Sequence, residues 1–148
     1  MCSGYMSPEY AMGGIFSEKT DIFSFGVLLL EIISGKKNTS PHFYEQTLNL
    51  VGYAWHLWNE GRVLELMDPE LVLSFCTSEV CRCIHVGLLC VQNNSKDRPT
   101  MSEVVLMLSS ETDRPEPKEP AFVASGKLLE HDHKPVTSGL SWSAVEAR

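Results

Sequence analysis

The sequence contains no apolar run long enough to cross a membrane. The longest one, residues 25–30, is cut by Glu31, whereas a membrane-spanning helix needs about 20 apolar residues. The first twenty residues lack a basic start followed by an apolar stretch, so we expect no secretory signal. These absences predict a cytoplasmic chain without a membrane span.

Positive charge is also scarce. Twelve basic residues stand against nineteen acidic ones, which gives a net charge of −7. A protein that binds along a nucleic-acid backbone needs clustered Lys and Arg side chains to neutralise phosphates. No basic run of this kind is present, so we do not expect a nucleic-acid partner.

A second cysteine cluster, which a zinc site would require, is missing. Four of the five cysteines lie between positions 76 and 90, where Cys83 and Cys90 are spaced to share one face of a helix. Cysteines among apolar neighbours are typical of a helical core in a reducing compartment. Residues 130–133 (Glu-His-Asp-His) offer metal-binding groups without a third anchor, and we expect no metal site.

The apolar residues that are present recur at helical spacing, and no segment alternates as a strand would. A helix is predicted over residues 17–34, with Ser17 at its N-cap and Gly35 as its C-terminal stop. Its central part is apolar on almost every side, which is typical of a helix at the centre of a fold. The predicted fold class is mainly α.

Three further helices complete the predicted fold. They span residues 47–60, capped by Thr47, residues 77–92, and residues 101–108, which begin after the capping box of Thr100 and Glu103. The chain then divides into a loop over residues 1–16, a helical unit over residues 17–110 and a polar, proline-containing tail over residues 111–148. We expect this tail to be extended and largely disordered.

Three short motifs lie in a fixed order along the chain. Residues 4–10 (Gly-Tyr-Met-Ser-Pro-Glu-Tyr) resemble the end of a protein kinase activation segment, and residues 21–27 (Asp-Ile-Phe-Ser-Phe-Gly-Val) resemble the start of the kinase F helix. Residues 97–100 (Asp-Arg-Pro-Thr) resemble the Arg-Pro before the last helix of the kinase C-lobe. Residues 29–38 and 83–92 look like plant receptor-like serine/threonine kinases of the S-domain (G-type lectin) group. The resemblance implies a partial kinase C-lobe without an N-lobe.

The resemblance implies roles for individual residues. Glu9 matches a glutamate that pairs with the arginine matched by Arg98, and this pair would clamp the activation segment to the helical base. Asp21 matches an aspartate that accepts backbone hydrogen bonds from the catalytic loop. The pocket for the substrate residue after the phosphoacceptor is matched by Tyr5, Met6 and Ser7. Outside this family context, Glu9 and Arg98 are two unrelated surface charges. Asp21 is then a favourable charge in the first turn of a helix, and residues 5–7 form a plain loop.

The residues that carry out phosphoryl transfer are absent. A kinase needs a Gly-x-Gly-x-x-Gly loop, a nucleotide-binding lysine, a His-Arg-Asp motif and an Asp-Phe-Gly motif, and we find none of these motifs in the chain. The resemblance implies that they precede Met1. We therefore assign no catalytic and no cofactor-binding residue, and ATP and Mg²⁺ are expected only for a full-length parent.

Two functions remain open from the sequence. The first is the C-terminal fragment of a receptor-like serine/threonine kinase, inactive alone, whose parent lies on the cytoplasmic side of the plasma membrane. The second is a non-catalytic interaction module that binds protein substrates or partner kinases. The helix with Trp55 and Trp58 is either its docking surface or part of the core. Since the segments that cover the residue 23–33 helix in the family are missing, we also expect self-association through exposed apolar surface.

Overall fold

The computed structural model describes residues 3–40, 43 and 49–120. Five α-helices form the body, namely α1 (Pro8–Gly13), α2 (Glu18–Ser34), α3 (Leu50–Asn59), α4 (Thr77–Cys90) and α5 (Met101–Ser109). Short 3-10 helices connect them, namely η1 (Ser3–Tyr5), η3 (Val63–Leu66), η4 (Pro69–Leu71) and η5 (Ser95–Asp97). In these described ranges the β-structure is limited to one isolated bridge between Gln92 and Pro120. The predicted mainly helical fold class is confirmed.

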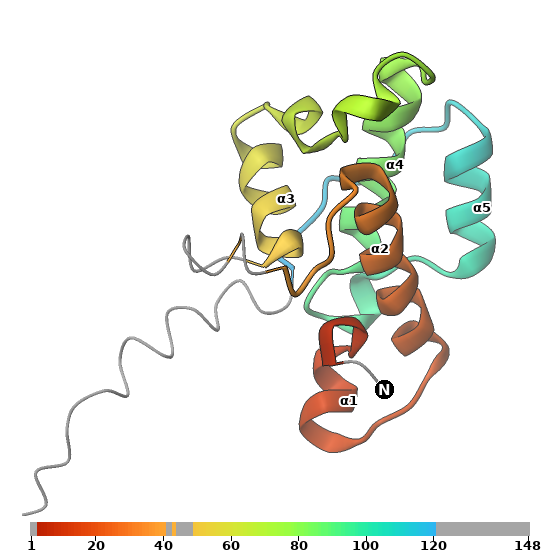
Figure 1. Cartoon of the computed structure of the whole chain (residues 1–148). Coiled ribbons are helices and arrows are strands. Elements are labelled where there is room, and N and C mark those ends of the chain that lie inside the picture. Colours follow the sequence, from red (N-terminus) through yellow and green to blue (C-terminus); the bar gives the residue numbers. More distant parts are fainter. Residues whose placement is uncertain (1–2, 41–42, 44–48, 121–148) are drawn as a thin grey trace, which may run out of the picture.

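Helix α2 lies at the centre of the molecule, as predicted. It packs along α4, with α3 on one side and α5 on the other (Figure 1). At its start the Ser17 amide donates to Thr20 Oγ1 over 3.1 Å, and at its end Gly35 takes a left-handed φ of 65°. A left-handed residue directly after the last turn is the common way to stop a helix, and glycine adopts it without a steric penalty.

The contact between α2 and α4 is close enough to require glycine. A Cβ atom built on Gly26 would lie 2.5 Å from Cys90 Cβ and 2.9 Å from the Gly87 carbonyl oxygen. On the opposite helix, a Cβ on Gly87 would lie 3.0 Å from Leu30 Cδ2. The two helices therefore meet closely. Gly26 cannot gain a side chain unless they separate, whereas at Gly87 the Leu30 side chain would have to shift.

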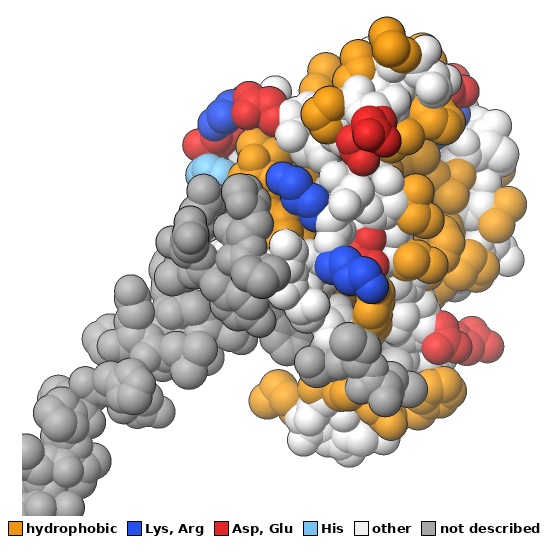
Figure 2. Space-filling view, in the orientation of Figure 1, with side chains coloured by type: hydrophobic (Ala, Val, Ile, Leu, Met, Phe, Trp, Pro, Cys, Tyr) orange, Lys and Arg blue, Asp and Glu red, His pale blue; other side chains and the backbone are white. Residues whose placement is uncertain are grey.

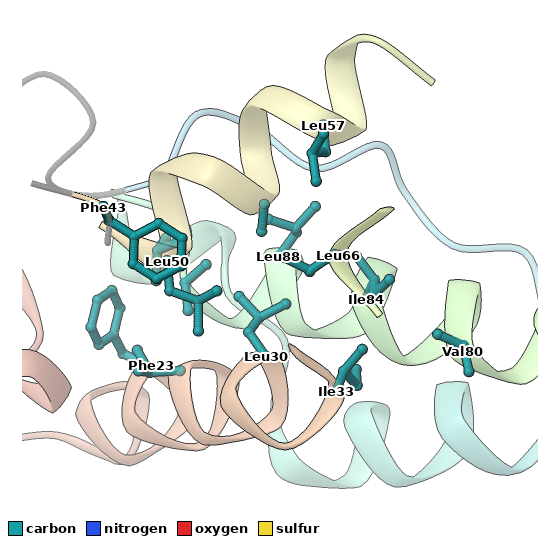
Figure 3. Close-up of a cluster of buried hydrophobic side chains, with 14 residues drawn as sticks. Phe23, Leu30, Ile33, Phe43, Leu50, Leu57, Leu66, Val80, Ile84 and Leu88 are labelled. Atoms are coloured by element: carbon teal, nitrogen blue, oxygen red, sulfur yellow. The ribbon is translucent and has the colours of Figure 1, made fainter. Parts of the chain in front are cut away.

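Two groups of buried side chains form the core. The larger one joins α2, α3 and α4 (Figure 3) and contains Phe23, Val27, Leu30, Ile33, Phe43, Leu50, Val51, Ala54, Leu57, Leu66, Val80, Ile84, Leu88 and Val91. The smaller one lies between α2, α4 and α5 and contains Ile22, Val86, Leu89, Cys90, Val104 and Met107. Helices α2 and α4 contribute to both groups, so this helix pair separates the two parts of the core and packs against both.

The start of α3 differs from the prediction. The helix begins at Leu50, where Asn49 is the N-cap and its Oδ1 accepts a hydrogen bond from the Gly52 amide over 2.8 Å. The predicted cap Thr47 was wrong, and this residue lies outside the described residues. Asn and Thr are both good caps, so composition alone does not choose between two candidates in one loop.

The predicted core position of the cysteines holds only in part. Cys90 is buried in α4, and burial raises the pKa of its thiol to about 12. Cys83 is only partly buried and packs against the larger core group. Cys76 is exposed just before α4, and a hydrogen bond with the Ser78 hydroxyl lowers the pKa of its thiol. Within the described ranges, His, Cys, Asp and Glu side chains form no group suited to a metal ion. Residues 130–133 lie outside those ranges.

The first part of the predicted tail is extended but attached to the body. The Glu119 carbonyl accepts a hydrogen bond from the Asn93 amide, and the Lys118 amide donates to Gln92 Oε1 over 2.8 Å. Pro117 and Pro120 are buried. The remaining residues 121–148 lie outside the described residues. Across the described part of the chain, no helix combines the length and apolar character that a membrane span needs.

Candidate functional site

Residues 4–7, which we call the docking loop after their predicted role, lie against α2. The Ser24 hydroxyl donates to the Tyr5 carbonyl over 2.7 Å, and the Tyr5 hydroxyl donates to Glu31 Oε2 over 2.6 Å. Tyr5 and Met6 are half-buried, and Ser7 is fully buried. Of the three predicted docking residues, Tyr5 is therefore held by the central helix through both its backbone and its side chain.

A second contact of the docking loop comes from the segment after α2. The side-chain amide of Asn38 donates from Nδ2 to the Gly4 carbonyl over 2.9 Å. The Asn38 backbone amide in turn donates to Glu31 Oε1 over 2.9 Å. Glu31 therefore uses one carboxylate oxygen for Tyr5 and the other for Asn38.

Directly after the docking loop, Glu9 in α1 forms an ion pair with Arg98. The Arg98 Nη1 and Nη2 atoms donate to Glu9 Oε1 and Oε2 over 2.7 and 2.9 Å, which is a bidentate geometry. Arg98 is only 1% exposed, and its guanidinium lies 5.1 Å from the centre of the Phe23 ring. The two residues are 89 positions apart in sequence, so this pair joins α1 to the turn between α4 and α5.

Arg98 also donates to three backbone carbonyls. Its Nε atom donates to Gln92 over 2.8 Å, Nη1 to Lys19 over 3.0 Å and Nη2 to Asn93 over 3.2 Å. Lys19 returns a hydrogen bond from its ammonium group to the Arg98 carbonyl. The guanidinium is thus satisfied on all sides, as a buried charge must be. It connects α1, the start of α2 and the turn after α4.

Asp21 lies apart from these contacts. It is exposed in the first turn of α2, where a negative charge is favourable because of the helix dipole. It makes no hydrogen bond or ion pair within the described ranges. Of the residues predicted from the sequence, the structure brings Glu9 and Arg98 together, and it leaves Asp21 separate. Tyr5, Met6 and Ser7 come shortly before Glu9 in the chain.

Burial and charge act in opposite directions on Glu9. Partial burial raises the pKa of its carboxyl group, but hydrogen bonds and charge from Arg98 outweigh this effect, and the pKa falls below the usual 4.5. Because the folded-state pKa is lower than the unfolded one, the pair stabilises the protein above about pH 4.5. This contribution is lost as the pH falls through the folded-state pKa.

We therefore expect the difference in unfolding free energy between the parent chain and Glu9→Gln to shrink as the pH is lowered from 6 to 3. Denaturant titrations across this range measure it. Glu65 and Glu103 also have lowered carboxyl pKa values, so they too contribute to the loss of stability at low pH. Only the difference in unfolding free energy between the parent chain and Glu9→Gln therefore reports on Glu9. Glu116→Gln, at an exposed position, is the control and should follow the parent at every pH. A difference that stays constant with pH would contradict the assignment.

The tryptophan helix contributes to the core. Trp55 and Trp58 in α3 are both partly buried and pack against the larger core group. The Trp58 ring lies 4.7 Å from the His85 ring, and His85 Nε2 is 2.8 Å from the Pro115 carbonyl oxygen. These contacts favour the core interpretation of the two tryptophans over a docking surface.

Comparison with known sequences identifies the family. A family profile described as "Protein tyrosine and serine/threonine kinase" matches residues 1–108. The chain belongs to the protein kinase family. It is a kinase-domain segment homologous to receptor-like serine/threonine kinases, and the predicted partial C-lobe is confirmed.

The similar proteins are plant receptor-like kinases. The G-type lectin S-receptor-like serine/threonine-protein kinase SD1-13 of Arabidopsis thaliana is 55% identical over 121 residues, which cover 81% of this chain and 15% of that protein. Cysteine-rich receptor-like protein kinase 10 of the same organism is 53% identical over 126 residues, covering 84% of this chain and 19% of that protein. The chain thus spans less than a fifth of the length of these relatives.

A solved structure with a similar fold is the pseudokinase domain of BIR2, described as an immune regulator of the RLK/Pelle family. It superimposes with a TM-score of 0.64 at 28% identity, over 73% of this chain and 32% of that chain. The fold of the matched part of this chain is therefore one found in a kinase-like domain of that family.

The sequence analysis missed two residues of this site, Glu31 and Asn38. Glu31 is the only charged residue between Asp21 and Lys36, in the middle of a strongly apolar helix. A single charged residue in an apolar helix requires hydrogen-bond partners when it is buried. Its position in the sequence could therefore have indicated that Glu31 is paired. Asn38 gave no such signal, because asparagine is ordinary in an exposed loop.

Proposed function

We propose that this chain forms the substrate-docking part and the structural base of a receptor-like serine/threonine protein kinase. The observation that carries the proposal is the double attachment of residues 4–9. Tyr5 is held by α2 through Ser24 and Glu31, and Glu9 is held by the buried Arg98. A segment that is fixed at both ends can present a peptide-binding surface with little loss of entropy on binding.

The parent kinase transfers the γ-phosphate of ATP to serine or threonine hydroxyls of proteins, and its kinase domain lies on the cytoplasmic side of the plasma membrane. Its partners are protein substrates or partner kinases. The described residues contain no cluster of three or more His, Cys, Asp or Glu side chains that could hold a metal ion, and the sequence has no Gly-rich loop to cover the phosphates of ATP. We expect the chain by itself to be inactive, and calorimetric titration with Mg-ATP should give no binding. Micromolar affinity would contradict this.

A chimeric kinase tests the docking role. The matching segment of the receptor-like serine/threonine-protein kinase SD1-7, which is 55% identical over 134 residues, is replaced by this chain, and phosphorylation of a serine peptide is measured. We expect an active chimera in which Glu9→Gln lowers kcat/KM roughly tenfold, since hydrogen bonds to a charged group are lost. The control Glu116→Gln should be unchanged. An inactive chimera beside an active SD1-7 domain would refute the proposal.

A second candidate is a non-catalytic interaction module, which the similarity to a pseudokinase domain favours. Apolar side chains gather where α2 and α5 lie and again over α1 (Figure 2). The exposed ones on α2 and α5 are Leu28, Ile32, Met101, Val105 and Leu106. We infer that a chain with this surface associates with a second copy or with a partner kinase. Sedimentation at micromolar concentration tests this, and a monomer with a cooperative thermal transition would count against it.

The mass of the endogenous protein separates the two candidates. Antibodies raised against residues 121–148 capture it from tissue, and mass spectrometry of the captured protein follows. A species far larger than 16.5 kDa would support the kinase parent. A species of 16.5 kDa would support the interaction module.

A further inference from the structure

We propose that Asn38 is a positioning residue that sets the affinity for the protein substrate by fixing the docking loop against the start of α3. The proposal deepens the docking function proposed above and rests on it. Asn38 lies in the segment between α2 and α3 and is 7% exposed, although its sequence neighbours Lys37 and Thr39 are exposed.

All four polar groups of Asn38 are hydrogen-bonded. Its amide N–H donates to Glu31 Oε1 over 2.9 Å, and its carbonyl accepts from the Leu50 amide over 3.4 Å. In the side chain, Nδ2 donates to the Gly4 carbonyl over 2.9 Å and Oδ1 accepts from the Val51 amide over 3.3 Å. One residue therefore contacts α2, the docking loop and α3.

The contacts with α3 supply acceptors for the amides at the start of this helix. The first amides of a helix have no partner within it and must find acceptors elsewhere. In α3, Asn38 accepts from the first two, Leu50 and Val51, while the local cap Asn49 accepts from Gly52. The helix start thus holds Asn38 in place by two bonds, and Asn38 holds the docking loop by a third.

The docking loop approaches this residue closely because Gly4 has no side chain. A Cβ atom on Gly4 would lie 2.8 Å from Thr39 Cγ2 and 3.7 Å from Asn38 Nδ2. A side chain at position 4 would therefore have to displace the Thr39 side chain before the Gly4 carbonyl could keep its contact with the Asn38 side-chain amide. Gly4 directly precedes Tyr5, so a shift at this junction moves the first predicted docking residue.

A substitution can remove the donor of the Asn38 side-chain amide and keep its acceptor. Asn38→Asp keeps an oxygen acceptor for the Val51 amide but removes the donor to the Gly4 carbonyl. In the chimeric kinase, we expect the KM for the peptide to rise about three- to tenfold, as the loss of one buried hydrogen bond implies. The kcat and the KM for ATP should stay unchanged. Asn59→Asp, an exposed position in α3, makes the same chemical change and should leave all three constants unaltered.

Hydrogen exchange on the 148-residue chain gives a readout that does not depend on activity. We expect Asn38→Asp and Gly4→Ala to raise the exchange of a peptide covering residues 4–9 while a peptide from α4 exchanges as before. Exchange that rises equally in both peptides would mean that Asn38 has only a general structural role. Unchanged exchange in residues 4–9 would also overturn the proposal.

The results distinguish a failure of this inference from a failure of the docking function. An active chimera whose peptide KM is unaffected by Asn38→Asp refutes the positioning role and leaves the docking function standing. An inactive wild-type chimera refutes the docking function and, with it, the effect on substrate affinity. In that case the exchange measurement still decides whether Asn38 holds the loop.

Discussion

Replacing Arg98 by methionine is expected to lower the free energy of unfolding by about 3–5 kcal/mol. Methionine fills a similar volume, so the loss comes from polar groups rather than from a cavity. The Glu9 carboxylate is left mostly buried without its partner, and the carbonyls of Gln92, Lys19 and Asn93 lose their donor. Since domains have net stabilities of about 5–15 kcal/mol, this single change removes a large fraction of the total.

Denaturant unfolding followed by circular dichroism measures this loss. Arg62→Met is the matched control, because Arg62 forms ion pairs with Glu60 and Glu65 at the surface, where such pairs contribute little. Arg98→Lys should also be destabilising, since an ammonium group cannot take both carboxylate oxygens and three carbonyls at once. If Arg98→Met were no more destabilising than Arg62→Met, the buried pair would not be what holds α1 to the helical unit.

Gly26→Ala is expected to destabilise the chain by about 2 kcal/mol. Alanine is favoured over glycine in a helix by about 1 kcal/mol, while overpacking typically costs about 1–3 kcal/mol and occasionally more. Here the added methyl group meets Cys90 Cβ and the Gly87 carbonyl, and neither atom is the flexible end of a side chain. The cost should therefore exceed the gain, because α2 and α4 must move apart along their whole contact.

The melting temperature of Gly26→Ala against that of Gly13→Ala tests this expectation. A methyl group on Gly13 at the end of α1 would meet only the Ile15 side chain at 3.6 Å, an ordinary contact, so this variant should melt near the parent temperature. A Gly26→Ala variant that is as stable as the parent would show that the two helices can separate without loss.

The sequence predicts elements whose signals are local. Both ends of α2 were placed correctly because Ser17 and Gly35 act within one turn of the helix. The capping box of Thr100 and Glu103 is likewise present, with the Thr100 amide 2.7 Å from Glu103 Oε2. The start of α3 was missed because Asn49 and Thr47 are both good caps in the same loop. Further acceptors for its first amides come from Asn38, twelve positions before the helix, and no local pattern records such a contact.

The candidate site shows the same division. The Glu9–Arg98 contact could be anticipated only through the family resemblance, since no spacing rule links residues this far apart. The backbone acceptors of Arg98 could not be anticipated at all, because a carbonyl has no sequence signature. Glu31 could be anticipated in part. As a single charge in an apolar helix it predicts a partner, but the sequence does not identify that partner as Tyr5 or Asn38.

The extended segment over residues 111–120 decides where the chain can be cut for expression. The family profile ends at residue 108, and truncation there would remove the acceptors of Asn93 and His85 and expose Gln92. The Gln92 side chain also donates to the Asp97 carbonyl, next to Arg98, so the damage would reach the ion pair. The shortest practical boundary is residue 120, and an affinity tag or fusion partner belongs after it.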